Sequence, residues 1–272
     1  MIAEHYAIDY QVHSFRSHDG LATIHDQCVR AIEIGLDEIG FTEHKDFDPK
    51  DPVVNHFDYV LYSGEIDAAR EEFAGRLVIR KGIEIDYQKW FVDEIREYLG
   101  RYAFDYVLGS VHYADRQMLM TAEYLMGRSR EEAYNLYFEA VLDSVKSGLI
   151  DIVGHLEYAN RRGVPALGPY SPEPFEEKLN EIFVAMIERG VVLEINTAGL
   201  RQGVGLTYPS PDTVVLYSQC GGKRISIGSD AHGPRDLGYE YAQAVEIALG
   251  CGLTDLVTWR ERVATSVPLA HL

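Results

Sequence analysis

Residues that commonly bind metal ions stand at the ends of short apolar segments in this chain of 272 residues. The first case is IDYQVHSFRSHDG at 8–20, where Asp9, Gln11 and His13 occupy alternate positions. Because side chains alternate between the two faces of a strand, these three are expected to point the same way. Histidine and aspartate in this arrangement indicate a metal site, in which glutamine would be a weaker zinc ligand than histidine.

Six further apolar segments end in the same way, and each is expected to form a strand. The seven expected strands span residues 6–12, 38–42, 77–84, 106–110, 152–155, 191–196 and 225–229. The polar residues at or just beyond their carboxyl ends are Gln11, His13, His18, Asp19, Glu43, His44, Glu84, Asp86, His112, His155, Asn196, Asp230 and His232. Six of the ten histidines belong to this set, so chance is a poor explanation for it.

Amphipathic segments separate the expected strands. Stretches such as TIHDQCVRAIEIG and PFEEKLNEIFVAMIERG repeat apolar residues at helical spacing and end in glycine, as helices often do. Regular alternation of strand and helix predicts a parallel sheet with right-handed crossovers. An open doubly wound sheet is the alternative, but no GxGxxG motif follows the first strand.

Seven such units without a reversal favour a single domain over residues 1–272, folded as a distorted (β/α)7 relative of the TIM barrel. In such barrels the functional site lies at the carboxyl ends of the strands, where the metal-binding residue types gather here. The longest irregular pieces, 45–62 and 160–173, would lie on the same face.

The composition narrows the class of protein and its partners. A formal net charge of −18 argues against a nucleic-acid partner, because phosphate backbones require basic surfaces. A small anionic substrate is compatible with that charge, since several divalent cations could reverse the local field. No apolar run approaches the ~20 residues of a membrane span, and MIAEHYAIDY does not resemble a signal peptide. We therefore expect a cytoplasmic protein without a membrane partner.

The chemistry expected of this ring of residues is that of a polynuclear metal site. Clustered buried imidazoles and carboxylates are costly unless a cation satisfies them. Nitrogen-rich ligation with some carboxylates suits Zn, Mn or Fe better than Ca or Mg. The carboxylate of Glu84 could bridge two cations, and such a pair generates hydroxide near neutral pH by lowering the pKa of bound water.

The motifs DYQVH, TEH, GIEID, GSVH, GH and GSDAH, in this order, resemble those of the PHP (polymerase and histidinol phosphatase) metallo-phosphoesterases. With INTAGLR and TYP downstream, the pattern is most similar to the histidinol-phosphate phosphatase branch. The resemblance covers nearly the whole chain, from Asp9 to beyond His232. It implies a (β/α)7 barrel with three divalent ions that hydrolyses L-histidinol phosphate to L-histidinol and phosphate in histidine biosynthesis.

The resemblance also implies a role for individual residues. The first metal would take Gln11, His13, Glu84 and Asp230, the second would share Glu84 and add His112 and His155, and the third would use His18, His44 and His232. A hydroxide bridging the first two metals would attack phosphorus. Asp230 and His232 would be the catalytic side chains, with Asp230 or a metal-bound water as proton donor to the leaving alkoxide.

Further residues are expected to bind the substrate or to orient the ligands. Arg161 and Arg201 each follow a site strand, and their guanidinium groups suit bidentate contact with phosphate. Asn196 is expected to hydrogen-bond a ligand oxygen or to fix the turn before Gly199. The acidic residues expected to orient metal ligands are Asp9, Glu43 and Asp86.

Two departures from the family pattern leave alternatives open. Gln11 stands where the family has histidine, which implies a looser or harder metal such as Mn, or an empty position. The loop after His112, YADRQMLMTAEYLMG, is rich in methionine and poor in acid. The alternatives are a PHP phosphoesterase for another small phosphate ester, or a metal-binding protein with impaired activity. An amidohydrolase-like enzyme is disfavoured, because no strand end offers a lysine.

Overall fold

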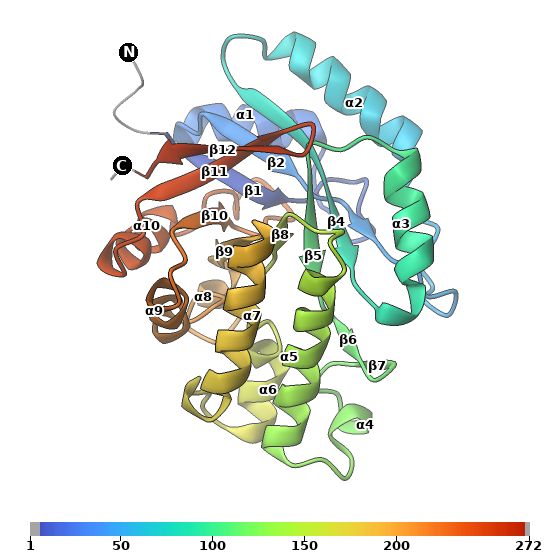
Figure 1. The fold of residues 1–272 in the computed structure, drawn as a ribbon. Coiled ribbons are helices and arrows are strands. Elements are labelled where there is room, and N and C mark those ends of the chain that lie inside the picture. Colours follow the sequence, from blue (N-terminus) through green and yellow to red (C-terminus); the bar gives the residue numbers. More distant parts are fainter. Residues whose placement is uncertain (1–5, 270–272) are drawn as a thin grey trace.

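The chain folds as an α/β protein around a mostly parallel sheet, in a computed structural model that describes residues 6–269 (Figure 1). The strands pair in the order β1 (Ile8–Val12), β2 (Glu38–Phe41), β4 (Val78–Asp86), β5 (Tyr106–Ser110), β8 (Ile152–Val153), β9 (Val192–Asn196), β10 (Arg224–Gly228), β11 (Asp255–Arg260) and β12 (Val263–Pro268). All seven expected strands are present. Neighbours are parallel as far as β11, and β11 and β12 form an antiparallel hairpin that the sequence pattern did not predict.

Three short strands lie outside this order. Strand β3 (His44–Lys45) pairs with the end of β4, so that His44 lies opposite Glu84. Strands β6 (Tyr113–Ala114) and β7 (Gln117–Met118) form a separate antiparallel hairpin. An isolated parallel bridge joins Val12, at the end of β1, to Ala231, just beyond β10. The first and seventh of the expected strands are therefore neighbours at their carboxyl ends.

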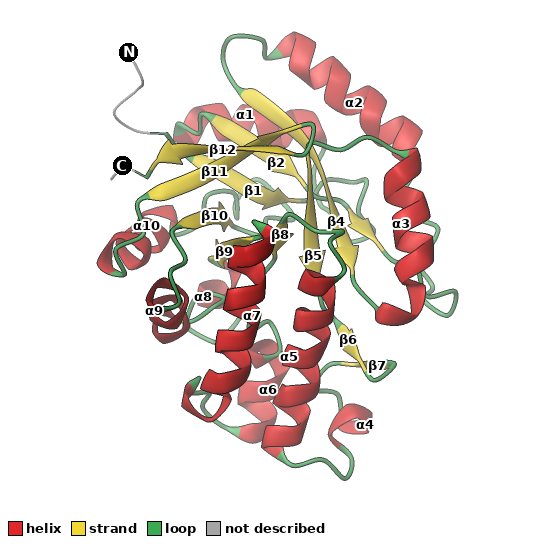
Figure 2. Cartoon of the chain, in the orientation of Figure 1, coloured by secondary structure: helices red, strands yellow, loops and turns green. Residues whose placement is uncertain are grey.

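Helices flank the sheet and connect its strands (Figure 2). They are α1 (Ile24–Ile34), α2 (Tyr59–Glu72), α3 (Val92–Arg101), α4 (Ala122–Leu125), α5 (Arg130–Lys146), α6 (Asn160–Leu167), α7 (Glu176–Arg189), α8 (Ala198–Arg201), α9 (Pro211–Gln219) and α10 (Tyr241–Gly250). Local signals set their ends: α1 begins at a capping box of Thr23 and Asp26 and ends at Gly35, whose positive φ suits glycine. Within residues 6–269, no helix combines the length and apolar character needed to cross a membrane.

One expected irregular piece is partly helical. The sequence pattern predicted a loop over 160–173, yet α6 occupies its first half despite Pro165. Pro165 is the sixth residue of this helix, beyond the four amides that lack an intrahelical partner, so it removes one hydrogen bond, and the helix ends two residues later. The piece at 45–62 is irregular as expected between β3 and α2.

An aromatic cluster fills the interior beneath the carboxyl ends of the strands. The rings of Tyr10 and Tyr106 stack with centroids 4.9 Å apart, and Trp259 packs 5.6 Å from Tyr10. Gly40 and Gly82 make room for them, because a Cβ at either position would lie within 2.5 Å of the Tyr106 side chain. The hydroxyl of Tyr106 donates to the carbonyl oxygen of Tyr10 at 2.8 Å. This aromatic cluster packs against the strands that carry the site and holds them in place.

Candidate metal centre

Side chains from six strand ends converge at the carboxyl edge of the sheet. They form three groups, each offering three ligand atoms within 4.8 Å of one another. The groups are His13, Glu84 and Asp230; Glu84, His112 and His155; and His13, His44 and His232. Residues up to 219 positions apart in sequence meet because parallel strands end at the same edge.

Glu84 lies at the centre of this arrangement, fully buried. Its Oε1 is 3.2 Å from Nε2 of His155 and 3.8 Å from Nε2 of His112. Its Oε2 is 3.3 Å from Nε2 of His13 and 3.5 Å from Nδ1 of His44. The two oxygens thus face different histidine pairs, which is the geometry that a carboxylate needs to bridge two cations.

The third group differs from the expected ligand set. His44 and His232 both face Asp19, whose carboxylate oxygens lie 3.6 Å and 3.1 Å from their Nε2 atoms. His18 lies 3.8 Å from Asp19 with its side chain partly exposed, and it joins none of the three groups formed within residues 6–269. The structure thus brings His44 and His232 together with His13, while the role of His18 in the third group stays a prediction, and Asp19 is a candidate site residue to which the sequence pattern assigned no role.

Three groups of the centre are held in the protonation state that binds a cation, whereas neighbouring carboxylates outweigh burial and raise the pKa values of His44, His155 and His232, which must lose a proton when a cation binds. Burial, together with the neighbouring His155, lowers the pKa of His112 to about 3. Burial and the nearby His232 likewise lower the pKa of His13, so both imidazoles have free lone pairs at neutral pH. Burial raises the pKa of Glu84, but His44, His155 and His13 outweigh it and hold that pKa well below its usual range. Neutral imidazoles beside an ionised carboxylate are the forms in which these groups bind cations.

Divalent cations fit this set of residues. The Nε2 atom of His13 is buried and has no hydrogen-bond partner within residues 6–269, although Asp230 Oδ1 lies 3.2 Å away. A buried imidazole nitrogen without a partner is costly. A cation between His13, Glu84 and Asp230 would satisfy it and would also offset the repulsion between the two carboxylates.

Glu43 fixes the loop that carries His13. Its carboxylate accepts hydrogen bonds from the hydroxyls of Ser14 and Ser17, both at 2.6 Å, and from the Ser14 amide. The Ser17 hydroxyl lies 3.2 Å from Nδ1 of His13 and accepts from the amide of His44 at 3.0 Å. Glu43 therefore orients two candidate ligands through one serine, the kind of role expected for it.

Asp86 and Asp9 also hold segments that carry candidate ligands. Asp86 Oδ1 accepts from the amide of His112 at 2.9 Å and lies 3.5 Å from its Nδ1. Asp9 accepts from the amides of Ser229 at 2.9 Å and Gly238 at 3.0 Å, which fixes the segment between them. Such contacts set ring and loop orientation before any cation binds.

A cavity of about 550 Å³ opens above the centre. His18, His44, His112, His155, His232, Asp19 and Asp230 line it, together with Arg161 and Arg201. Arg161 donates to the hydroxyl of Tyr158 at 2.7 Å. Arg201 donates to the carbonyl oxygens of Ser229 at 2.7 Å and Asp230 at 2.8 Å, so part of its guanidinium holds the loop after β10.

Asn196 does not line this cavity. It is fully buried, and its amide donates to Oε1 of Gln11 at 2.6 Å and to Oε2 of Glu194 at 3.1 Å. Its Oδ1 accepts from the amide of Ala198 at 2.8 Å. The Asn196 side chain thus turns into the protein, and these contacts agree with the alternative in which it fixes the following turn. Contact with a ligand oxygen stays a prediction.

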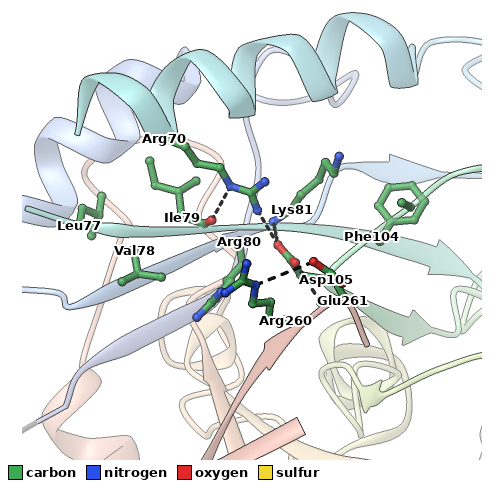
Figure 3. A pocket seen from close by; sticks show the side chains of 11 residues that line it. Arg70, Leu77, Val78, Ile79, Arg80, Lys81, Phe104, Asp105, Arg260 and Glu261 are labelled. Carbon is green, nitrogen blue, oxygen red and sulfur yellow. Dashed lines mark hydrogen bonds and ion pairs between the residues drawn. The ribbon is translucent and has the colours of Figure 1, made fainter. Parts of the chain in front are cut away.

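A second cavity, of about 530 Å³, lies at the opposite end of the sheet (Figure 3). It is lined by several cations, among them Arg70, Arg80 and Lys81. Arg70 pairs with Asp105 at 2.6 Å, and Arg80 pairs with Glu38. Its basic residues are thus already engaged, and this end of such sheets usually serves stability. The metal centre is the better functional site.

The comparison with known families agrees with this site. The family model described as "PHP domain" matches residues 9–198. The chain belongs to the PHP domain family. Among relatives of this PHP protein, the "Probable histidinol-phosphatase" of Deinococcus radiodurans is 33% identical over 245 residues, covering 85% of this chain and 88% of that one. The histidinol-phosphatase of Lactococcus lactis is 31% identical over 236 residues, covering 83% and 84%.

A solved structure extends the likeness to the fold. The histidinol phosphate phosphatase of Lactococcus lactis, crystallised with Zn, L-histidinol and phosphate, superimposes with a TM-score of 0.87 at 28% sequence identity. The alignment covers 95% of the PHP protein described here and 98% of that chain. The mostly parallel α/β architecture is therefore shared over nearly the whole length.

Proposed function

We propose that this protein is a metal-dependent phosphomonoesterase that hydrolyses L-histidinol phosphate to L-histidinol and phosphate. The observation that carries the proposal is Glu84, whose two oxygens face separate histidine pairs beneath a cavity that also contains Arg161 and Arg201. The relatives named histidinol-phosphatase support the same reaction.

We propose further that the centre holds three divalent ions of Zn, Mn or Fe, with His13 a ligand of one of them only, because its Nδ1 is engaged with Ser17. When bound, such ions supply Lewis acidity and lower the pKa of a water molecule that attacks phosphorus. The guanidinium groups of Arg161 and Arg201 would bind and orient the phosphate oxygens. His13 and His232 outweigh burial to lower the pKa of Asp230 to about 2, so its side chain is ionised at neutral pH. This favours a water molecule over Asp230 as proton donor to the leaving alkoxide.

The cavity suits a substrate with charges of both signs. Asp46 and Asp51 line it together with the two arginines. L-Histidinol phosphate combines an anionic phosphate with a cationic ammonium and an imidazole, so the arginines and the aspartates could bind opposite ends. Tyr113 and Met118, from the β6–β7 hairpin, line the cavity as well and would contact the apolar part of the substrate.

We propose that strands β1 to β10 close into a distorted (β/α)7 barrel within a single domain over residues 1–272. The bridge between Val12 and Ala231 supports closure. Two hydrogen bonds support it too: the amide of His13 donates to the Ala231 carbonyl at 2.8 Å, and the Ala231 amide donates to the Gln11 carbonyl at 3.2 Å.

The test is phosphate release from a panel of small phosphate esters by protein reloaded with Zn, Mn or Fe after chelation. We expect kcat/KM for L-histidinol phosphate to exceed that of every other ester. Another preferred ester would replace the substrate while keeping the reaction class. No phosphate release from any ester by the fully loaded protein would refute the enzymatic proposal. Arg260→Gln, in the opposite cavity, is the control variant with unchanged rates.

A further inference from the structure

The side chain of Gln11, at the end of β1, is fully buried and both ends of its amide are hydrogen-bonded. Its Nε2 donates to Oε2 of Glu84 at 3.0 Å. Its Oε1 accepts from Nδ2 of Asn196 at 2.6 Å. The carbonyl oxygen is the atom by which a glutamine ligates a cation, and here Asn196 engages it.

The partner of Gln11 is itself held in place. Asn196 bonds through Oδ1 to the amide of Ala198 and through Nδ2 to Glu194 as well as Gln11. Glu194 in turn accepts from the amide of His155 at 2.7 Å through the same Oε2. Every link is buried, so rotation of the Asn196 amide would leave buried polar groups without partners, which costs free energy.

Close packing leaves the hydrogen-bonded side chains of Gln11, Asn196 and Glu194 little freedom to rearrange. Gly228 lies against it on β10, where an added Cβ would sit 2.0 Å from Oε1 of Glu194 and 2.8 Å from Cβ of Gln11. The absence of a side chain at this position gives the two polar side chains their space. The hydrogen-bonded chain Gln11–Asn196–Glu194 is thus built into β1 and β9.

The bond from Gln11 acts on the carboxylate that the two histidine pairs share. Glu84 Oε2 faces His13 at 3.3 Å and His44 at 3.5 Å, and the Gln11 N–H approaches the same oxygen. On the other side, Oε1 accepts from the hydroxyl of Ser110. The Gln11 N–H on one oxygen and the Ser110 hydroxyl on the other restrict rotation of the carboxylate. Each oxygen therefore keeps facing its own histidine pair.

We propose that Gln11 is a positioning residue for Glu84 and not a metal ligand. The group of His13, Glu84 and Asp230 then has three protein ligands, which leaves its cation with open positions and a weaker hold than a fourth side chain would give. This inference rests on the proposed metal-dependent function, and it predicts that the ion between His13, Glu84 and Asp230 exchanges more readily than it would with a fourth side-chain ligand.

The first experiment counts metal ions per chain by elemental analysis after dialysis against a competing chelator. Gln11→Leu should retain as many ions as wild type, since it removes no ligand. Gln11→His should retain one more ion and release it at least about tenfold more slowly, because an imidazole adds a ligand. Loss of one ion from Gln11→Leu, or no gain in Gln11→His, would overturn the proposal. If Gln11→Leu does not fold, Gln11→Ala takes its place with the same expected metal content, because it also removes the amide without adding a ligand.

The second experiment measures thermal unfolding of the metal-free protein. Gln11→Leu and Asn196→Leu should each lower the melting temperature by about 2–8 °C, and the double variant should fall by less than the sum, since both break one hydrogen bond. Gln27→Leu, another buried glutamine without contact to Asn196, is the control and should add independently. If the decreases in melting temperature of the Gln11 and Asn196 variants simply add in the double variant, the proposed hydrogen bond between the two side chains is contradicted. Neither measurement uses phosphate release, so failure here is distinct from failure of the proposed function.

Discussion

Replacing Glu84 by glutamine is the sharpest test of the metal centre. Glu84→Gln keeps shape and burial but removes the negative charge that His13, His44 and His155 face within 3.2–3.5 Å. Removing one partner of a buried ionic contact costs about 3–5 kcal/mol, or roughly 160- to 5,000-fold in binding. Because both oxygens face separate groups, two of the three proposed ions should be lost at ordinary metal concentrations, and phosphate release should fall to background.

The assay is metal content per chain after dialysis, measured beside kcat for L-histidinol phosphate. The matched control is Glu194→Gln, a fully buried carboxyl behind the same cluster. Burial raises the pKa of Glu194 to about 8, so at pH 7 the amide replaces a largely neutral acid and metal content should be unchanged. Three retained ions and near-normal turnover in Glu84→Gln would refute the shared-carboxylate reasoning.

Three further predictions concern the substrate, the pH and the core. Arg161→Gln should raise KM at least about tenfold with metal content unchanged, whereas Arg201→Gln should also loosen metal, since its guanidinium holds the loop after β10. In the metal-free protein, Asp19 and Asp230 outweigh burial and raise the pKa of His232 to about 9. Its stabilisation is therefore full below pH 6.5 and is lost as pH rises through 9, so the melting-temperature difference from His232→Gln should shrink over that range. Gly82→Ala should cost about 1–3 kcal/mol of unfolding free energy, because its Cβ would overlap the ring of Tyr106.

Each of these predictions has a result that would contradict it. An unchanged KM in Arg161→Gln would remove that residue from phosphate binding. A constant difference between wild type and His232→Gln from pH 6.5 to 9 would mean that the imidazole is not protonated in the folded, metal-free state. If Gly82→Ala unfolds at the same denaturant concentration as wild type, the aromatic cluster around Tyr106 can shift without loss of unfolding free energy.

The strands and the edge that carries the site could be predicted from the sequence. Each expected strand is a short buried run followed by an ionisable or amide side chain, and that signal is local. Parallel pairing then brings those ends together, so the convergence of Glu84 with His112 and His155 follows from topology alone. The β11–β12 hairpin was not predicted, because Asp255–Pro268 contains no histidine and adds no side chain to the candidate metal groups.

Side-chain direction in the loops could not be predicted. Asp19 rather than His18 faces the third group because the loop after β1 folds back: the amide of Leu21 donates to the His232 carbonyl at 2.7 Å, and that of Phe15 donates to Ala22 at 2.8 Å. Likewise Asn196 turns inward because Gln11 and Glu194 offer it buried partners. Such choices depend on contacts between distant segments, which spacing along the chain does not reveal.

The two-sided position of Glu84 has a consequence for how the protein responds to metal supply. The two proposed ions on either side would draw on one carboxylate, so their affinities would be coupled, and by thermodynamic reciprocity each would change the affinity for the other by the same factor. Loading would then depart from that of independent sites, and activity would not follow free-metal concentration as a simple one-site curve.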